Sequence, residues 1–152
     1  MLFDDLLKAL DEKRAPLFLT ERTEHLDEFA DRLKGFAKNV IVLKGGMTGK
    51  RRAAIMEKLA SVSDDHERVI LATGRYIGEG FDDARLDTLF LAMPISWRGT
   101  LQQYVGRLHR AHYRKKVVKV YDYVDERIPM FARMYEKRLK GYKALGYSIG
   151  AD

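Results

Sequence analysis

Two arginines and a glutamine recur at helical spacing in the segment TLQQYVGRLHR, residues 100–110. At about 100° per residue, one stripe of a helix here would carry four residues at i, i+3, i+4 and i+7: Gln103, Gly106, Arg107 and Arg110. Guanidinium groups one turn apart suit a phosphate chain, because each is a planar fork of donors that stays charged. The segment therefore predicts phosphate chemistry.

The opposite side of this helix is apolar, with Leu101, Val105 and Leu108, and is expected to face a sheet. A glycine in mid-helix costs about 1 kcal/mol relative to alanine, which favours close approach by a bulky group at Gly106. Two other interpretations stay open. Arg-x-x-Arg also occurs on ordinary solvated helix faces, and Gln103 with Thr100 fits a capping box.

The segment VLKGGMTGKRRAA, residues 42–54, resembles a phosphate-binding P-loop but fails its pattern at both ends. Lys44 stands where the first glycine is required, and Arg51 replaces the hydroxyl residue that ligates Mg²⁺. What remains is a glycine turn at Gly45 and Gly46, followed by a cationic helix start. Such a start attracts anions, including a phosphate of a nucleic-acid backbone.

No metal site is predicted. The chain has no cysteine, which excludes disulfides and zinc–thiolate sites. His109 and His112 lie three residues apart without an adjacent carboxylate, so we assign them structural use.

Composition describes one globular domain of 152 residues with 46% hydrophobic residues and a net charge of +6. No apolar run is long enough for a membrane span, and the acids in MLFDDLLKAL argue against a signal peptide, so we expect a cytoplasmic protein without a membrane partner. The charge suits a polyanionic partner, although an ordinary basic surface explains it equally well.

Apolar runs alternate with amphipathic segments along the chain. Strands are predicted at 17–20, 39–43, 68–73, 87–93 and 117–124, and helices at 2–10, 23–33, 49–60, 99–112 and 129–143. This order predicts an α/β fold with a mostly parallel central sheet covered by helices on both faces. Ligands then gather beyond the carboxyl ends of the strands, at residues 20–22, 44–50, 73–82 and 94–98.

Four segments together resemble the motifs of superfamily-two helicases of the DEAD/DEAH-like type, and they occur in the family's order. Residues 16–33 resemble motif IV, 42–52 the glycine turn after the next strand, 70–94 motif V with the following strand, and 103–110 motif VI. The sequence of residues 70–110 most resembles the sequences of DNA helicases and restriction-type translocases.

The resemblance implies the carboxyl-terminal, second RecA-like domain of a two-domain motor, with three layers. Residues 1–152 would form this domain, with a leading helix at 1–15, a core at 16–124 and a final helix and tail at 125–152. ATP and Mg²⁺ would be held mainly by an absent amino-terminal RecA-like domain. Asp122, which could pass for a magnesium ligand of that first domain, follows motif VI and is interpreted as part of the sheet edge.

The resemblance also implies roles for individual residues. Arg107 and Arg110 would contact the γ-phosphate of ATP, with Arg110 as the arginine finger. Residues on the nucleotide side would be Gly80, Asp82, Gln103 and Gly106, with an N-cap as the alternative for Asp82.

A nucleic-acid phosphate would be held by Thr73 and Gly74. Arg22 and Arg52 match backbone-contacting positions, although surface solvation is equally compatible with both. Gly45 and Gly46 serve the turn, with a phosphate contact as a second role. The cations of the final helix, Arg138 among them, are interpreted as a solvated basic face, with a docking surface as the alternative.

These residues predict one motor domain of an ATP-dependent helicase or translocase, acting on nucleic acid and with DNA preferred. Without a P-loop and magnesium-binding acids, the isolated domain is predicted to be inactive. The alternative is a non-enzymatic nucleic-acid-binding or regulatory module that has kept the fold.

Overall fold

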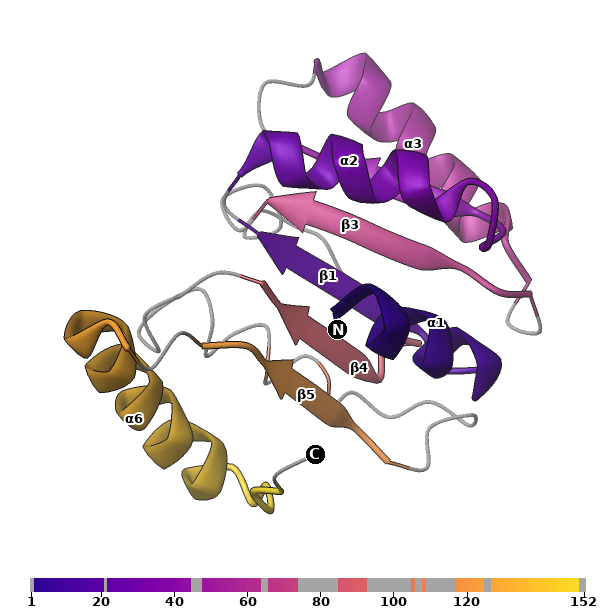
Figure 1. Ribbon diagram of the computed structural model, residues 1–152. Helices are drawn as coiled ribbons and strands as arrows, with labels where there is room; N and C mark the ends of the chain where they lie inside the picture. Colours follow the sequence, from indigo (N-terminus) through magenta and orange to yellow (C-terminus); the bar gives the residue numbers. More distant parts are fainter. Residues whose placement is uncertain are drawn as a thin grey trace.

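A computed structural model describes residues 2–20, 22–44, 48–63, 66–73, 85–92, 105, 108, 117–124 and 127–150. Five parallel strands form one sheet in the order β2-β3-β1-β4-β5 (Figure 1). They are β1 (Pro16–Thr20), β2 (Val40–Leu43), β3 (Val69–Thr73), β4 (Thr88–Leu91) and β5 (Lys119–Asp122). Every residue of β1, β3 and β4 is buried, as expected for central strands of a parallel sheet covered on both faces.

Helices cover both faces of the sheet. They are α1 (Leu2–Asp11), α2 (Thr23–Leu33), α3 (Gly49–Ser61) and α6 (Pro129–Ala144). The side chains of β1 alternate between the two faces: Phe18 packs with α1 and α2, whereas Leu17 and Leu19 pack with α3 and α6. In the described ranges, no helix has the length and apolar character to cross a membrane.

The predicted strands are all present, and so are four of the five predicted helices, with ends that differ by at most two residues. The fifth predicted helix, at 99–112, lies outside the described residues except for two positions. These are Val105 and Leu108, with 0% and 1% of their surface exposed, so both are buried in the core as predicted.

Arg14 ties three strands together at their amino ends. Its Nε donates to Thr88 Oγ1 over 2.6 Å, and its second terminal nitrogen donates to the carbonyl oxygens of Asp87 (3.1 Å) and Val117 (2.8 Å). The Asp87 carboxylate in turn accepts from the backbone N–H of Ala15 over 2.9 Å. This end of the sheet is therefore closed by hydrogen bonds between the segments that begin β1, β4 and β5.

A buried ion pair attaches α6 to β5. Arg138 has no exposed surface and donates to both carboxylate oxygens of Asp122, over 2.7 and 2.8 Å, and the Tyr142 hydroxyl donates to the same carboxylate over 2.7 Å. Burial alone would lower the pKa of Arg138, but its hydrogen bonds to Asp122 outweigh this and raise the pKa. Burial raises the pKa of Tyr142, and the charge of Asp122 raises it further.

The solvated basic face predicted for the final helix was therefore wrong at one position. Arg133, Lys137 and Lys140 are exposed, whereas Arg138 is in the core. The reason is that Arg138 lies one turn before Tyr142, on the stripe of α6 that faces β5. The interpretation of Asp122 as part of the sheet edge is consistent with this pairing.

Replacing Arg138 by alanine is expected to lower the free energy of unfolding by about 3–5 kcal/mol, because the Asp122 carboxylate would stay buried without its cation. Arg133→Ala, on the exposed side of the same helix, is the matched control and should change stability by less than about 0.5 kcal/mol. Urea denaturation followed by circular dichroism measures both. Equal effects would contradict the assignment of Arg138 as the anchor of α6.

Candidate nucleic-acid interface

The residues that follow β1, β2 and β3 all lie at one edge of the sheet. All five strands are parallel, so their carboxyl ends meet there. In open α/β sheets this edge is where ligands bind. Within the described residues, Thr20, Arg22, Lys44, Thr48 and Thr73 belong to this edge, as the predicted loop positions required.

Two threonines lie opposite each other at the ends of neighbouring strands. Thr20 of β1 is in register with Thr73 of β3. Thr20 is fully buried, and its hydroxyl oxygen accepts from the backbone N–H of Arg22 over 3.2 Å. Thr73 has 8% of its surface exposed, and its buried hydroxyl has no hydrogen-bond partner among the described residues.

A buried hydroxyl without a partner costs free energy, and most such groups in proteins are satisfied. The orphan hydroxyl of Thr73 therefore indicates a position where a ligand would supply the missing hydrogen bond. It lies at the edge of the sheet where α2 begins, since Arg22 directly follows β1 and is the N-cap of that helix.

The amino-terminus of α2 has no side-chain cap. Arg22 has extended backbone angles, and its side chain makes no cap hydrogen bond. Uncapped N–H groups and the helix dipole favour an anion. Glu24 adds one negative charge in the same turn, so the exposed Arg22 guanidinium offsets it. The set of Thr73, Arg22 and the α2 amino-terminus is suited to one phosphate group.

The second helix start at this edge is arranged differently. Thr48 caps α3 by accepting from the backbone N–H of Arg51 over 3.2 Å, and Arg52 is half-buried in the first turn. The Lys44 ammonium lies 3.2 Å from a carboxylate oxygen of Asp27 in α2. The charge of Lys44, which precedes the glycine turn, is therefore paired with α2.

Comparison with known proteins identifies the family. Residues 1–112 match the family described as the helicase conserved C-terminal domain, which is well over half of the chain. The chain belongs to this family. Uncharacterized protein 108L of Invertebrate iridescent virus 3 is 32% identical over 102 residues, which is 66% of this chain and 91% of that protein.

Solved structures show the same fold at low sequence identity. The carboxyl-terminal part of the Fun30 ATPase domain superposes with a TM-score of 0.68 at 18% identity, covering 88% of this chain and 43% of that one. Domain 2 of the DEAD-box helicase Mss116p, solved bound to an RNA duplex, gives a TM-score of 0.63 at 15% identity, covering 98% of this chain and 57% of that one. This chain thus spans about half the length of these solved chains.

The resemblance to superfamily-two helicases and the RecA-like α/β fold class are both confirmed. The structure of this helicase C-terminal domain describes three of the predicted site residues: Thr73, Arg22 and Arg52. The others lie outside the described residues: Gly45, Gly46, Gly74, Gly80, Asp82, Gln103, Gly106, Arg107 and Arg110.

Arg85 connects the end of the motif V segment to α3. Its guanidinium donates to the carbonyl oxygens of Val62 (2.6 Å) and Leu59 (3.2 Å), at the carboxyl end of that helix. The Leu59 carbonyl also accepts from the backbone N–H of Val62, and a cation at this end of the helix complements its dipole. This contact attaches Arg85, three residues before β4, to the carboxyl end of α3 in the helicase C-terminal domain.

Sequence reasoning placed Thr20 and Thr48 in the predicted ligand-binding loops but gave neither residue an individual role. Thr48 had a readable signal, because threonine immediately before a helical segment is a common N-cap. Thr20 had none, since its position beside Thr73 depends on which strands are neighbours.

Thr73→Val is expected to leave the free energy of unfolding unchanged or to raise it, because valine removes an unpartnered hydroxyl while keeping the shape. Thr20→Val, in the paired strand, should lower it by about 1 kcal/mol because the N–H of Arg22 loses its acceptor. Chemical denaturation of the two variants measures the contrast. Destabilisation by Thr73→Val as large as that by Thr20→Val would show that the Thr73 hydroxyl has a partner within the protein.

Proposed function

We propose that this chain is the second motor domain of an ATP-dependent nucleic-acid helicase or translocase, with DNA as its track. The observation that carries the proposal is the buried hydroxyl of Thr73, which has no hydrogen-bond partner among the described residues, beside the uncapped start of α2. It supports a phosphate-binding role at the position where the motif V resemblance implies one. Family membership supports the motor context.

The domain grips one strand through its sugar–phosphate backbone. Thr73 and Gly74 donate to one phosphate, and Arg22 neutralises its charge at the start of α2. Arg52 and the turn at Gly45 and Gly46 hold a neighbouring phosphate. Contacts of this kind position the protein on nucleic acid without reading sequence, as a motor that moves along any sequence requires.

ATP binds between this domain and an amino-terminal RecA-like domain of the same protein. The described residues do not form a nucleotide site of their own, because Lys44 is paired with Asp27 and Arg51 stands at the hydroxyl position of a P-loop. The first domain therefore supplies the P-loop and the Mg²⁺ ligands. This domain closes on the γ-phosphate with Arg107 and Arg110.

Within that cleft, Arg110 is the arginine finger that stabilises charge on the transferred phosphoryl oxygens. The remaining motif residues on the nucleotide side are Gln103, Gly106, Gly80 and Asp82. Gly80 and Asp82 follow Thr73 in the same motif V segment. Nucleotide-dependent closure is thereby coupled to the grip on the strand.

The rival function is a non-enzymatic nucleic-acid-binding or regulatory module with the same fold. Such a module would keep the phosphate site at Thr73 and would have no use for a γ-phosphate sensor. The presence of both Arg107 and Arg110 in the motif VI pattern favours the motor.

The isolated chain is expected to bind single-stranded DNA weakly, with an affinity that falls steeply as salt is raised, and to hydrolyse no ATP. Arg22→Ala should weaken binding and lower the slope of log affinity against log salt by about one, because one phosphate contact is lost. Fluorescence anisotropy with DNA and RNA oligonucleotides of one sequence measures affinity and track preference.

Arg32→Ala is the matched control at the other end of α2, where the guanidinium lies 4.1 Å from the centre of the Phe3 ring. It should leave the salt slope unchanged. Robust ATP hydrolysis by the isolated chain would refute its interpretation as one domain of a two-domain motor. Equal slopes of log affinity against log salt for the two variants would refute the phosphate site at the start of α2.

In the complete protein, containing this chain and its amino-terminal ATPase domain, Arg110→Ala is expected to lower the turnover of ATP by at least about 10²-fold. DNA affinity should hardly change, because the arginine acts on the γ-phosphate. A coupled ATPase assay and anisotropy on the same preparation separate the two effects. Unchanged turnover would end the assignment of Arg110 and leave the binding module as the better description.

A further inference from the structure

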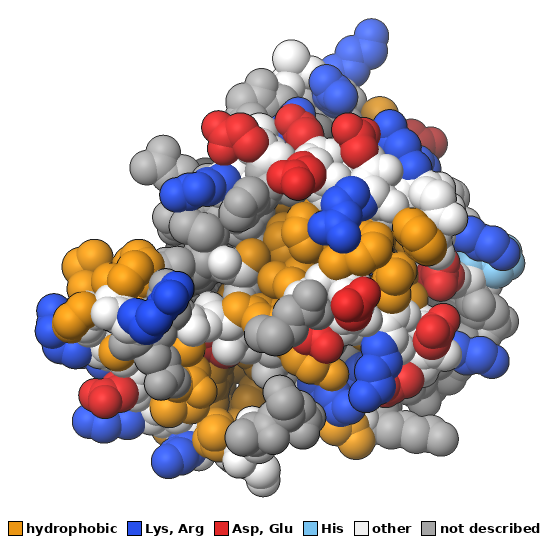
Figure 2. All heavy atoms as spheres, viewed as in Figure 1, with side chains coloured by type: hydrophobic (Ala, Val, Ile, Leu, Met, Phe, Trp, Pro, Cys, Tyr) orange, Lys and Arg blue, Asp and Glu red, His pale blue; other side chains and the backbone are white. Residues whose placement is uncertain are grey.

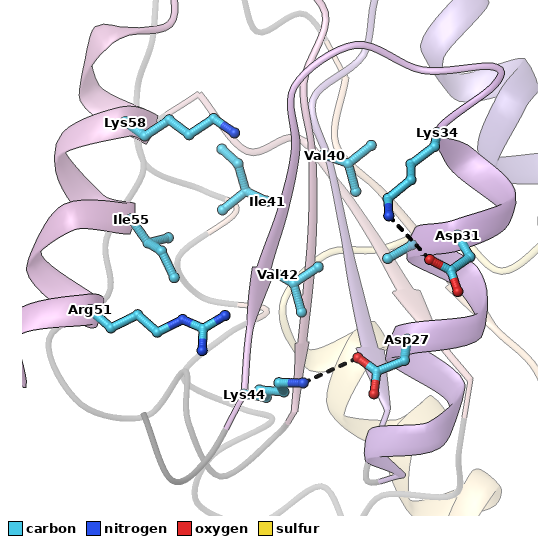
Figure 3. Close-up of a pocket in the computed structure, with 11 residues that line it drawn as sticks. Asp27, Asp31, Lys34, Val40, Ile41, Val42, Lys44, Arg51, Ile55 and Lys58 are labelled. Atoms are coloured by element: carbon cyan, nitrogen blue, oxygen red, sulfur yellow. Dashed lines mark hydrogen bonds and ion pairs between the residues drawn. The ribbon is translucent and has the colours of Figure 1, made fainter. Parts of the chain in front are cut away.

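A groove of about 520 Å³ runs along the outer side of β2, the strand next to β3, and reaches Lys44 near the carboxyl end of the sheet. Its floor is β2, the first strand in the sheet order, and its walls are α2 and α3 (Figure 3). In the described part of the chain, β2 has a neighbouring strand on one side only. The other side of the strand faces the groove.

The backbone of β2 presents hydrogen-bonding groups to this open side. The backbone carbonyl oxygen of Asn39 accepts a hydrogen bond from the N–H of Val69 in β3. This contact determines which residues of β2 direct their backbone groups toward β3. Alternate residues of a strand direct their N–H and C=O groups the same way. Ile41 therefore faces β3, and Val40 and Val42 direct their backbone donors and acceptors to the open side.

The side chains around the open edge are apolar near the strand. Val40 and Val42 pack on the α2 side of the sheet, and Ile41 packs on the α3 side with Ile55. Figure 3 shows these side chains lining the groove between the two helices. An extended peptide with apolar residues at every second position matches such a surface.

The charges on the two walls differ. On the α2 wall, Asp31 is 3.3 Å from the Lys34 ammonium and Asp27 is 3.2 Å from that of Lys44, so its charges are paired. On the α3 wall, Arg51 and Lys58 are two turns apart and exposed. Neither side chain has an ion-pair partner within the described residues.

We propose that this groove binds an extended acidic segment of a partner protein as an added strand on β2. The backbone of the segment pairs with Val40 and Val42, its acidic side chains face Arg51 and Lys58, and its apolar side chains face α2. Main-chain pairing supplies affinity and the alternate side chains supply specificity.

A nucleic-acid strand fits this groove less well. Carboxylates gather along α2 (Figure 2), and those of Asp27 and Asp31, which line the groove, already pair with its lysines Lys44 and Lys34, so this wall offers a phosphate no free cation among the lining residues. A phosphate backbone also offers no N–H donors to the carbonyl oxygens of Val40 and Val42. In a third role, Arg51 and Lys58 would only keep the edge strand β2 from pairing with other chains and aggregating. This role predicts that no peptide binds, and the experiment below tests it.

The probe is a fluorescein-labelled peptide that alternates Asp or Glu with Val or Ile, titrated with the 152-residue chain and followed by anisotropy. The double variant Arg51→Glu/Lys58→Glu should weaken binding at least about tenfold, since both cations reverse sign. Lys137→Glu, an exposed lysine of α6 beyond the opposite edge of the sheet, is the matched control. It should change binding by less than about twofold.

A second readout tests strand addition directly. Bound peptide should slow hydrogen exchange of the Val40 and Val42 amides and leave that of Ile41 unchanged, and a peptide methylated at alternate backbone nitrogens should not bind. Val42→Pro removes one outward N–H without touching the β3 ladder and should also weaken binding.

The proposal is overturned if the peptide does not bind, if it binds the double variant equally well, or if the methylated peptide binds as tightly. It is also overturned if the double variant loses affinity only for an oligonucleotide, which would make the groove part of the nucleic-acid interface. Peptide binding requires neither ATP nor DNA, so its failure would leave the proposed motor function untouched.

Discussion

The parallel pairing of β1 with β3 and β4 is the constraint on which the rest of the structure depends. Antiparallel neighbours would place the ends of successive strands at opposite edges. Parallel pairing instead brings Thr20 and Thr73, distant in sequence, side by side, and places the start of α2 next to them. The proposed phosphate site, made of backbone N–H groups and one hydroxyl, would be a consequence of this topology, because Thr73 ends β3 and α2 follows β1.

The elements of this fold could be predicted from the sequence because their signals are local. Continuous apolar runs specify the buried strands, and Pro129 opens α6 where its missing N–H costs nothing. Thr73 could be named from its motif, but its lack of a hydrogen-bond partner could not, since that depends on everything packed around it. Arg138 shows the same limit: spacing places it on a stripe of α6, while only the approach of Asp122 decides that the stripe is buried.

Sheet order is the information that the local pattern lacks. The chain runs from β1 to β2, yet β3 lies between them, so β2 becomes an edge strand. Nothing in the VIVL run distinguishes an edge from a centre, and its alternating burial appears only after folding. The groove between α2 and α3 has paired acids on one wall and, on the other, cations without an ion-pair partner among the described residues. Residue patterns could not predict it, because it depends on the sheet order.

The two ends of the sheet carry different polar contacts. At the amino ends, Arg14 and the Asp87 carboxylate hydrogen-bond to groups of the neighbouring segments. At the carboxyl ends, the Thr73 hydroxyl is buried without a hydrogen-bond partner among the described residues, and α2 begins without a side-chain cap. Unsatisfied groups cost stability, and they are tolerated where binding satisfies them. In the function proposed above, a bound phosphate would supply the hydrogen bond that the Thr73 hydroxyl lacks and so recover this free energy.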